Sequence, residues 1–128
     1  LVALSVLLVF GMASANAQVL PDWVLIHEWG DRSKTFVDRN SIEKTGNTAQ
    51  AWVNYYMEPP GKEKLSQKEV REMLNLEEYD CSKRAVRVHR IVFNYTDGTT
   101  GEPFQPVAEW KLASGGNEIT LSFLCDSE

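Results

Sequence analysis

The sequence predicts an exported, single-domain α+β protein that is closed by one disulfide. An apolar run opens the 128-residue chain and ends in the small residues that signal peptidase recognises. Much of the remaining chain alternates between apolar and other residues with the period of β-strands, and turn residues interrupt this pattern. The two cysteines, Cys81 and Cys125, form the even pair that an oxidising compartment normally joins.

Residues 1–17 are expected to be a signal peptide. Their apolar core covers residues 1–10, and a small-x-small tripeptide ends at Ala17. This core is too short for a membrane span, which needs about 20 apolar residues. The chain begins with Leu1 and not with Met, so we expect the charged start of the leader to lie upstream. Cleavage near Ala17 would leave residues 18–128 as one domain in the periplasm, in the medium or on the cell surface, without an integral membrane segment.

The charge of the chain limits its partners. The net charge is −5, and all charged residues lie after position 17. Nucleic-acid binding favours a basic surface, and anionic membranes attract basic segments. A mildly acidic domain therefore argues against both kinds of partner.

Residues 22–29 and 35–37 are expected to form a hairpin around a turn at residues 30–34. Alternation puts four side chains on one face of the first strand: Trp23, Leu25, His27 and Trp29. Residues 38–42 are typical of a single helical turn, which the carboxylate of Asp38 is suited to cap.

Residues 48–57 form the clearest strand of the sequence. One face carries Ala49, Ala51, Val53, Tyr55 and Met57, and the other carries Trp52 and Tyr56. The following Glu-Pro-Pro-Gly segment, residues 58–61, is expected to end the strand because proline cannot donate to a ladder.

The second half of the chain is less uniform. Residues 84–95 are expected to form a strand with Val86, Val88, Arg90 and Val92 on one face and Ile91, Phe93 and Tyr95 on the other. Residues 70–76 fit a short helix or a strand, and residues 115–125 also fit both, with Ser114 available as an N-cap in the helical case. Residues 99–109 are expected to be a loop.

No catalytic, metal or cofactor site is predicted. His27 and His89 each lie in a strand among apolar neighbours, where histidine is usually structural. No Gly-x-Ser-x-Gly, His-x-x-x-His, Cys-x-x-Cys or phosphate-binding loop occurs. Glu78 and Asp80 could share a strand face, but calcium needs six or more oxygens, so a solvated face is the simpler interpretation.

Two features indicate binding and not chemistry. The first is the set of four tryptophans and four tyrosines, which either fill the core or anchor an interface. The second is a basic group beside Cys81, although alternation would turn Arg87 away from Arg84 and Arg90. The candidate partner-binding residues are Lys83, Arg84, Arg87, Arg90, Tyr56 and Tyr95.

Several short motifs together resemble the surface-adhesin E family of Gram-negative bacteria. They are Asp22-Trp23-Val24-Leu25, Thr35 to Ile42, Gly46-Asn47 with Ala51-Trp52-Val53, Glu78-Tyr79-Asp80-Cys81 with Arg84 and Arg87, and finally Trp110 and Cys125. Their order and spacing cover residues 22–125, which is nearly the whole exported domain.

This resemblance implies a mostly antiparallel sheet with a C-terminal helix, which Cys81–Cys125 ties to it. It therefore favours a strand at residues 71–81 and a helix that leads into Cys125. The residues that it implies to be structural are Trp23, Asp38, Trp52, Asp80 and Trp110. It also implies a non-enzymatic adhesin that contacts host or extracellular-matrix proteins. The alternative is a periplasmic accessory protein with a partner in the bacterial envelope. The sequence indicates neither the ligand nor the oligomeric state.

Overall fold

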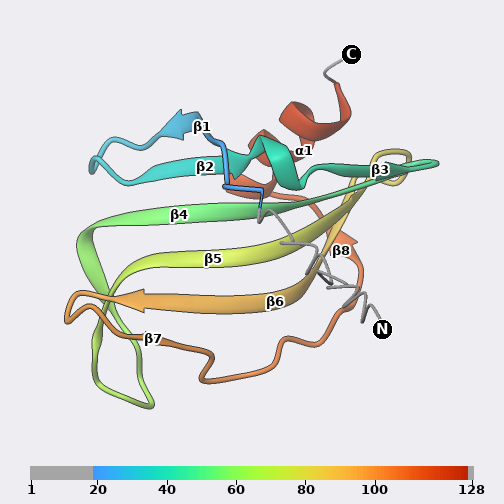
Figure 1. The fold of residues 1–128 in the computed structure, drawn as a ribbon. Helices are drawn as coiled ribbons and strands as arrows, with labels where there is room; N and C mark the ends of the chain where they lie inside the picture. The colour runs from blue at the N-terminus through green and yellow to red at the C-terminus, as the bar shows by residue number, and fades with distance from the viewer. Residues whose placement is uncertain (1–18, 127–128) are drawn as a thin grey trace, which may run out of the picture.

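The structure, a computed structural model, describes residues 19–126. A curled antiparallel sheet carries one C-terminal helix on one of its faces (Figure 1). The strands are β1 (Trp23–Glu28), β2 (Lys34–Asp38), β3 (Glu43–Thr45), β4 (Thr48–Lys62), β5 (Glu69–Asp80), β6 (Ala85–Tyr95), β7 (Thr100–Gly101) and β8 (Lys111–Leu112). A 3₁₀ turn, η1 (Arg39–Ser41), follows β2, and α1 (Gly116–Cys125) is the last element.

The main path of the sheet runs β1-β2-β4-β5-β6-β7, while β3 pairs with β4 and β8 pairs with β6. All of these pairs are antiparallel. The predicted sheet, C-terminal helix and disulfide are therefore present. Strands account for far more of the described chain than the single α-helix, so the α+β label fits only loosely.

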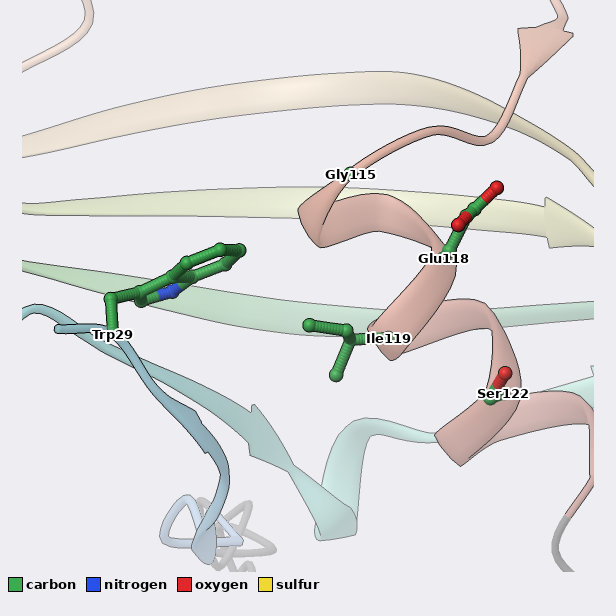
Figure 2. Close-up of a pocket in the computed structure, with 5 residues that line it drawn as sticks. All are labelled: Trp29, Gly115, Glu118, Ile119 and Ser122. Atoms are coloured by element: carbon green, nitrogen blue, oxygen red, sulfur yellow. The ribbon is translucent and has the colours of Figure 1, made fainter.

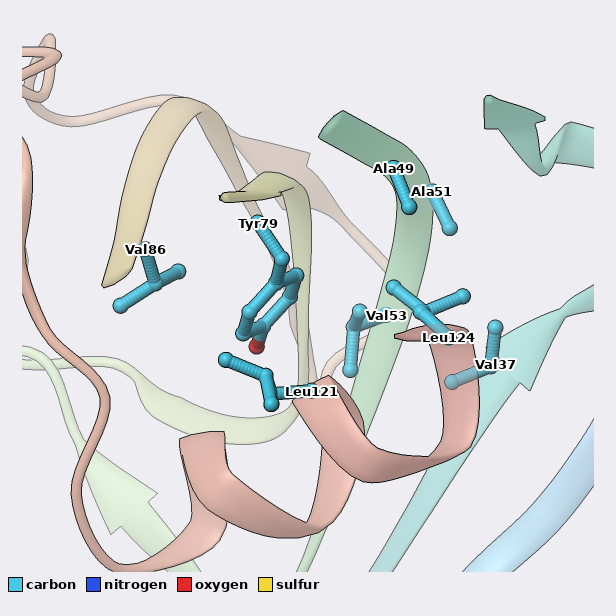
Figure 3. Packing of buried hydrophobic residues seen from close by; sticks show 8 residues of the cluster. All are labelled: Val37, Ala49, Ala51, Val53, Tyr79, Val86, Leu121 and Leu124. Atoms are coloured by element: carbon cyan, nitrogen blue, oxygen red, sulfur yellow. The ribbon is translucent and has the colours of Figure 1, made fainter. Parts of the chain in front are cut away.

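The core lies between α1 and the sheet face that it covers. Leu121 and Leu124 are one helical turn apart, and neither is exposed. They pack on side chains from four strands, as Figure 3 shows: Val37, Ala49, Ala51, Val53, Tyr79 and Val86. A second buried cluster of Val70, Phe93 and Tyr95 lies along β5 and β6. The predicted inner face of β4 is thus confirmed.

Two β-bulges change the faces expected for β1 and β6. In β1, Leu25 pairs with Phe36 and His27 with Thr35, so Ile26 is an extra residue. Trp23 and Leu25 therefore lie on the face opposite α1, whereas His27 lies on the α1 side. The expectation that all four residues share one face was wrong: His27 and Trp29 lie on the α1 side and Trp23 and Leu25 on the other, because strict alternation does not survive an inserted residue.

The bulge in β6 has the same effect. Arg90 pairs with Leu76 and Val88 with Glu77, so His89 is the extra residue. Val86 and Val88 consequently share the α1 side with Ile91, Phe93 and Tyr95. Val92 lies on the opposite face, which corrects its predicted grouping with the two other valines.

The two prolines do not end β4. The strand continues to Lys62, and the ladder with β5 breaks after Tyr56–Glu72 and resumes at Gly61–Val70. Residues 57–60 thus oppose one residue, Arg71, whose Nη1 donates to the carbonyl of Met57 at 2.9 Å. Proline is tolerated here because it lies in a bulge, where no ladder donor is needed.

The other expected elements are largely present. The Asp38 carboxylate accepts the backbone N–H of Asn40 at 3.0 Å, which confirms the capped turn. The ambiguous residues 70–76 are in β5, and the C-terminal segment is helical. The residue before α1 is Gly115 and not Ser114, and its φ of 57° lies in the left-handed region that favours glycine. The short strands β3, β7 and β8 were not predicted, and β7 lies within residues 99–109, which were expected to be a loop.

The disulfide joins the last residue of α1 to the turn after β5. The Cα atoms of Cys81 and Cys125 are 5.6 Å apart. The predicted signal peptide, residues 1–17, lies outside the described residues. No helix between residues 19 and 126 has both the length and the apolar character that crossing a membrane requires.

Candidate functional site

The sheet face opposite α1, which we call the open face, carries a set of apolar and arginine side chains. Alternation puts Trp52 on this face, because its neighbours Ala51 and Val53 are in the core. We define the open face by Trp23, Trp52, Leu74, Arg87, Arg90 and Val92. None of these six side chains is fully buried. The helix α1 packs on the other face of the sheet, where it forms the core. In the described part of the chain, the open face therefore remains partly exposed to solvent.

A hollow of about 340 Å³ lies on the open face. Its lining is mostly apolar and comes from five strands and the segment before β1: Pro21, Trp23, Asp38, Trp52, Leu74, Val92 and Asn94. The volume lies at the lower end of the range for ligand sites, which combine apolar walls with a few polar groups. Asp38 and Asn94 are the polar groups in this lining.

The β6 bulge brings Arg87 and Arg90 to the same face. Alternation alone predicted that they diverge, but the extra residue His89 restores them to one side, opposite Glu78 and Leu76. The Nε atom of Arg87 donates to Glu78 at 2.6 Å, and that of Arg90 donates to Glu102 at 2.7 Å. Each arginine is thus neutralised, and the open face is not a basic patch.

The contacts with the arginines lower the pKa values of Glu78 and Glu102. Burial opposes ionisation of Glu78, but hydrogen bonds from Arg87 and His89 outweigh it, so the pKa of this carboxyl is lowered. The hydrogen bonds from Arg90 likewise lower the pKa of Glu102. Both groups are therefore ionised at neutral pH and hold the arginines in place.

Three arginines lie over aromatic rings on or beside the open face. The guanidinium carbon is 4.4 Å from the ring centre in the pair Arg87–Trp110, 5.8 Å in Arg90–Trp52 and 5.4 Å in Arg71–Tyr56. Distances below about 6 Å allow cation–π attraction. These contacts hold the arginine and aromatic side chains that dominate protein interfaces in fixed arrangements.

The structure separates the predicted partner-binding residues. Arg87, Arg90 and Tyr56 all lie on the side of the sheet opposite α1, but Tyr56 is farther along it, beside Glu72 and Arg71. Lys83 and Arg84 are exposed in the turn between β5 and β6. Tyr95 is only 8% exposed and belongs to the second buried cluster, so it is not part of the open face.

The residues that the family resemblance implied to be structural have different surroundings. Asp80 accepts the backbone N–H groups of Ser82 and Lys83 and so holds the turn. Trp23 and Trp52 line the hollow and are only partly buried, while Trp110 is 40% exposed above Arg87. These three tryptophans therefore contribute to the surface of the domain.

Several residues of this surface were not singled out from the sequence. Glu72 accepts the side-chain amides of Asn54 and Asn94, each at 3.2 Å. The Oδ1 atom of Asn54 is buried without a hydrogen-bond partner among the described residues. The alternation of polar residues with core residues in β4 and β5 was the available signal, but ordinary solvated strands show the same pattern.

A second hollow lies on the other side of the sheet, between α1 and the end of β1 (Figure 2). Its volume is about 590 Å³, and across it Trp29 faces Gly115, which precedes α1, and the helical residues Glu118, Ile119 and Ser122. The indole Nε1 of Trp29 donates to Thr35 at 3.2 Å, which fixes the ring. This hollow contains one charged group and no arginine–aromatic pair.

The two histidines have structural partners. The ring of His27 meets that of Trp29 edge to face at 4.3 Å between centroids. The Nε2 atom of His89 is 2.8 Å from Glu78. Between residues 19 and 126, no three side chains of His, Cys, Asp or Glu are grouped so that they could hold a metal ion.

Comparisons with known proteins agree with this architecture. The family described as surface-adhesin protein E matches residues 23–115. No curated protein matches the chain. A solved structure, the selenomethionine form of protein E from Haemophilus influenzae, is similar with a TM-score of 0.59 and 11% sequence identity, over 84% of this chain and 93% of that chain. At this identity, the similarity shows a shared fold.

Proposed function

Because the chain belongs to the surface-adhesin protein E family, we propose that it is an exported, non-enzymatic binding module that contacts a protein partner through its open face. The family supports an adhesin-like surface protein in general terms. The binding surface, the matrix or host partner and the cleavage of residues 1–17 are our proposals.

The arginine–aromatic pairs carry this proposal. Interfaces concentrate their binding energy in Trp, Tyr and Arg, and here Arg87, Arg90, Trp52 and Trp110 are already ordered on one exposed face. Ordering these long side chains before binding lowers the entropy that association would cost. The apolar hollow beside them could receive a side chain of the partner.

The partner need not be acidic. Glu78 and Glu102 neutralise the two arginines, so an apolar centre with a polar rim is the surface that a partner meets. This arrangement fits a protein surface better than a polyanion. Lys83 and Arg84, in the turn beside β6, are proposed as rim contacts.

The first test is the location of the protein. The full-length precursor would be expressed in Gram-negative cells, and intact cells would be treated with protease and labelled with antibody. We expect cleavage and labelling on intact cells. Protection until the outer membrane is opened would contradict surface display and favour the periplasmic accessory protein.

The second test concerns the open face. Purified protein would be titrated onto immobilised fibronectin and collagen, and the variant Trp52→Leu/Arg90→Ala would be compared with wild type. We expect at least tenfold weaker binding, because truncation of an interface hot spot costs about 2 kcal/mol or more. The control is Leu65→Ala, which removes an exposed apolar side chain in the loop after β4. Equal binding by the wild type and the open-face variant would overturn the assignment of this surface.

A further inference from the structure

The carboxylate of Glu77 is buried on the α1 side of the sheet, away from the open face. The residue is 1% exposed. The hydroxyl of Tyr55 donates to it at 2.7 Å, that of Tyr79 at 2.6 Å and the side-chain amide of Asn75 at 3.0 Å. All three donors are neutral, so no cation among them balances an ionised Glu77.

A cavity of about 260 Å³ adjoins this carboxylate. Its lining combines three strands with the start of α1: Tyr55, Met73, Asn75, Glu77, Val88, Gly116 and Asn117. None of these residues is basic. Met73 and Val88 supply apolar walls, while Glu77 supplies negative charge when it is ionised.

Asn75 provides an independent observation. It is 6% exposed, and its Oδ1 atom has no hydrogen-bond partner among the described residues. Its Nδ2 donates one hydrogen bond to Glu77, and the unpaired Oδ1 remains as an acceptor. A buried acceptor without a donor costs about 1–3 kcal/mol, which a ligand with N–H groups would recover.

We propose that this cavity binds a primary ammonium group on a short alkyl chain. The ammonium would donate to Asn75 Oδ1 and to the Glu77 carboxylate, and the alkyl chain would lie against Met73 and Val88. Such a group occurs in free alkylamines and in the lysine side chain of a partner protein. This site is separate from the open face, so its failure would leave the proposed adhesin function untouched.

The surroundings of Glu77 set the pH dependence of binding. The groups that face it are Tyr55 from β4, Tyr79 from β5, Val88 from β6 and Asn117 from α1, which donates to the Tyr79 hydroxyl. Burial first, and then the negative charge of Glu77, raises the pKa of both tyrosines, so they stay neutral. Burial also raises the pKa of Glu77. Because the ammonium needs an ionised partner, binding should strengthen as the pH rises through the pKa of Glu77.

The test is a titration of the purified ¹⁵N-labelled protein with butylammonium chloride, followed by NMR. We expect saturable shifts at the side-chain amide of Asn75 and at the backbone amides of Gly116 and Asn117. Glu77→Gln should weaken binding about tenfold or more, as the loss of a hydrogen bond to a charged group predicts. The control is Glu118→Gln, which removes an exposed charge from α1, the helix whose first residues line the cavity. This variant should change binding less than about twofold.

Other probes separate the possible outcomes. Asn75→Leu removes the unpartnered acceptor and should also weaken binding, so the test does not depend on one variant. Neutral n-pentanol should bind more weakly than butylammonium. Equal binding by n-pentanol, or by Glu77→Gln, would overturn the proposal. Nα-acetyl-lysine N-methylamide distinguishes the sources, since its binding supports a lysine side chain, and binding of butylammonium alone supports a free amine.

Discussion

The guanidinium carbon of Arg87 lies 4.4 Å from the ring centre of Trp110 and joins the segment before β8 to the open face. Arg87 is partly buried, so its attraction to the ring is less screened than at a fully exposed site. We predict a coupling of about 0.5–1 kcal/mol between these residues in a double-mutant cycle of unfolding free energies with Arg87→Ala and Trp110→Ala.

A matched cycle supplies the control for this coupling. Arg39→Ala removes an exposed arginine whose partner is Asp22, and it should not couple to Trp110→Ala. A coupling of zero in the Arg87 cycle would show that the two side chains do not stabilise each other, and the preordered surface would lose its main support.

Asp38→Ala should destabilise the protein by about 1 kcal/mol. The Asp38 carboxylate accepts the backbone N–H of Asn40 at 3.0 Å and that of Asp22 at 2.8 Å, so it caps η1 and holds the chain ahead of β1. Chemical denaturation measures this loss. Asp31→Ala, which removes a similar contact to Ser33 in an exposed turn, should cost less than about 0.5 kcal/mol. Equal losses in the two variants would mean that the cap is unimportant.

The sequence predicted the strands well, because a face that packs on α1 requires alternation. Ala49, Ala51 and Val53 show this rule most clearly. The alternation rule failed to predict the faces of residues in strands that contain an inserted residue. Ile26 and His89 are the inserted residues in β1 and β6, and each changes the face of the residues beyond it. No local feature of the sequence marks such a bulge.

The same bulge explains why the candidate surface was only partly predicted. Arg87 and Arg90 were identified by charge, but their shared face depends on the extra residue His89. Tyr95 was identified by its chemistry, although the second cluster buries it at 8% exposure. The cavity near Glu77 could not be predicted at all, since it needs contacts between β4, β5, β6 and α1.

Reduction of the Cys81–Cys125 disulfide should lower the melting temperature by well over ten degrees. The bond closes a loop of 44 residues, and chain entropy assigns about 4 kcal/mol to a loop of this length. A loss of 1 kcal/mol shifts the melting temperature of a domain of this size by several degrees. Calorimetry with and without reductant gives the shift, and a Cys81→Ser/Cys125→Ser variant, measured without reductant, serves as the control. A change of one or two degrees would mean that the bond contributes little.

Glu77 should make the protein less stable as the pH rises. Burial raises the pKa of Glu77 in the folded state above its ordinary value of 4.5. Between these two pKa values the folded protein binds more protons than the unfolded chain, so stability falls with increasing pH in this window and levels off above it. Glu77→Gln cannot ionise. The unfolding free energy of wild type minus that of Glu77→Gln should therefore decrease as the pH rises from the ordinary carboxyl pKa of 4.5 through the raised pKa of the folded state.

Glu102→Gln provides the matched comparison for this pH dependence. The hydrogen bonds from Arg90 lower the pKa of Glu102, so its contribution is complete above the unfolded pKa and is lost only as the pH falls through the folded pKa. The difference between wild type and Glu102→Gln should hence stay constant over the range in which the Glu77 difference declines. Urea denaturation at several pH values measures both differences. A constant difference for Glu77→Gln as well would show that Glu77 ionises without penalty and that its surroundings already stabilise the negative charge.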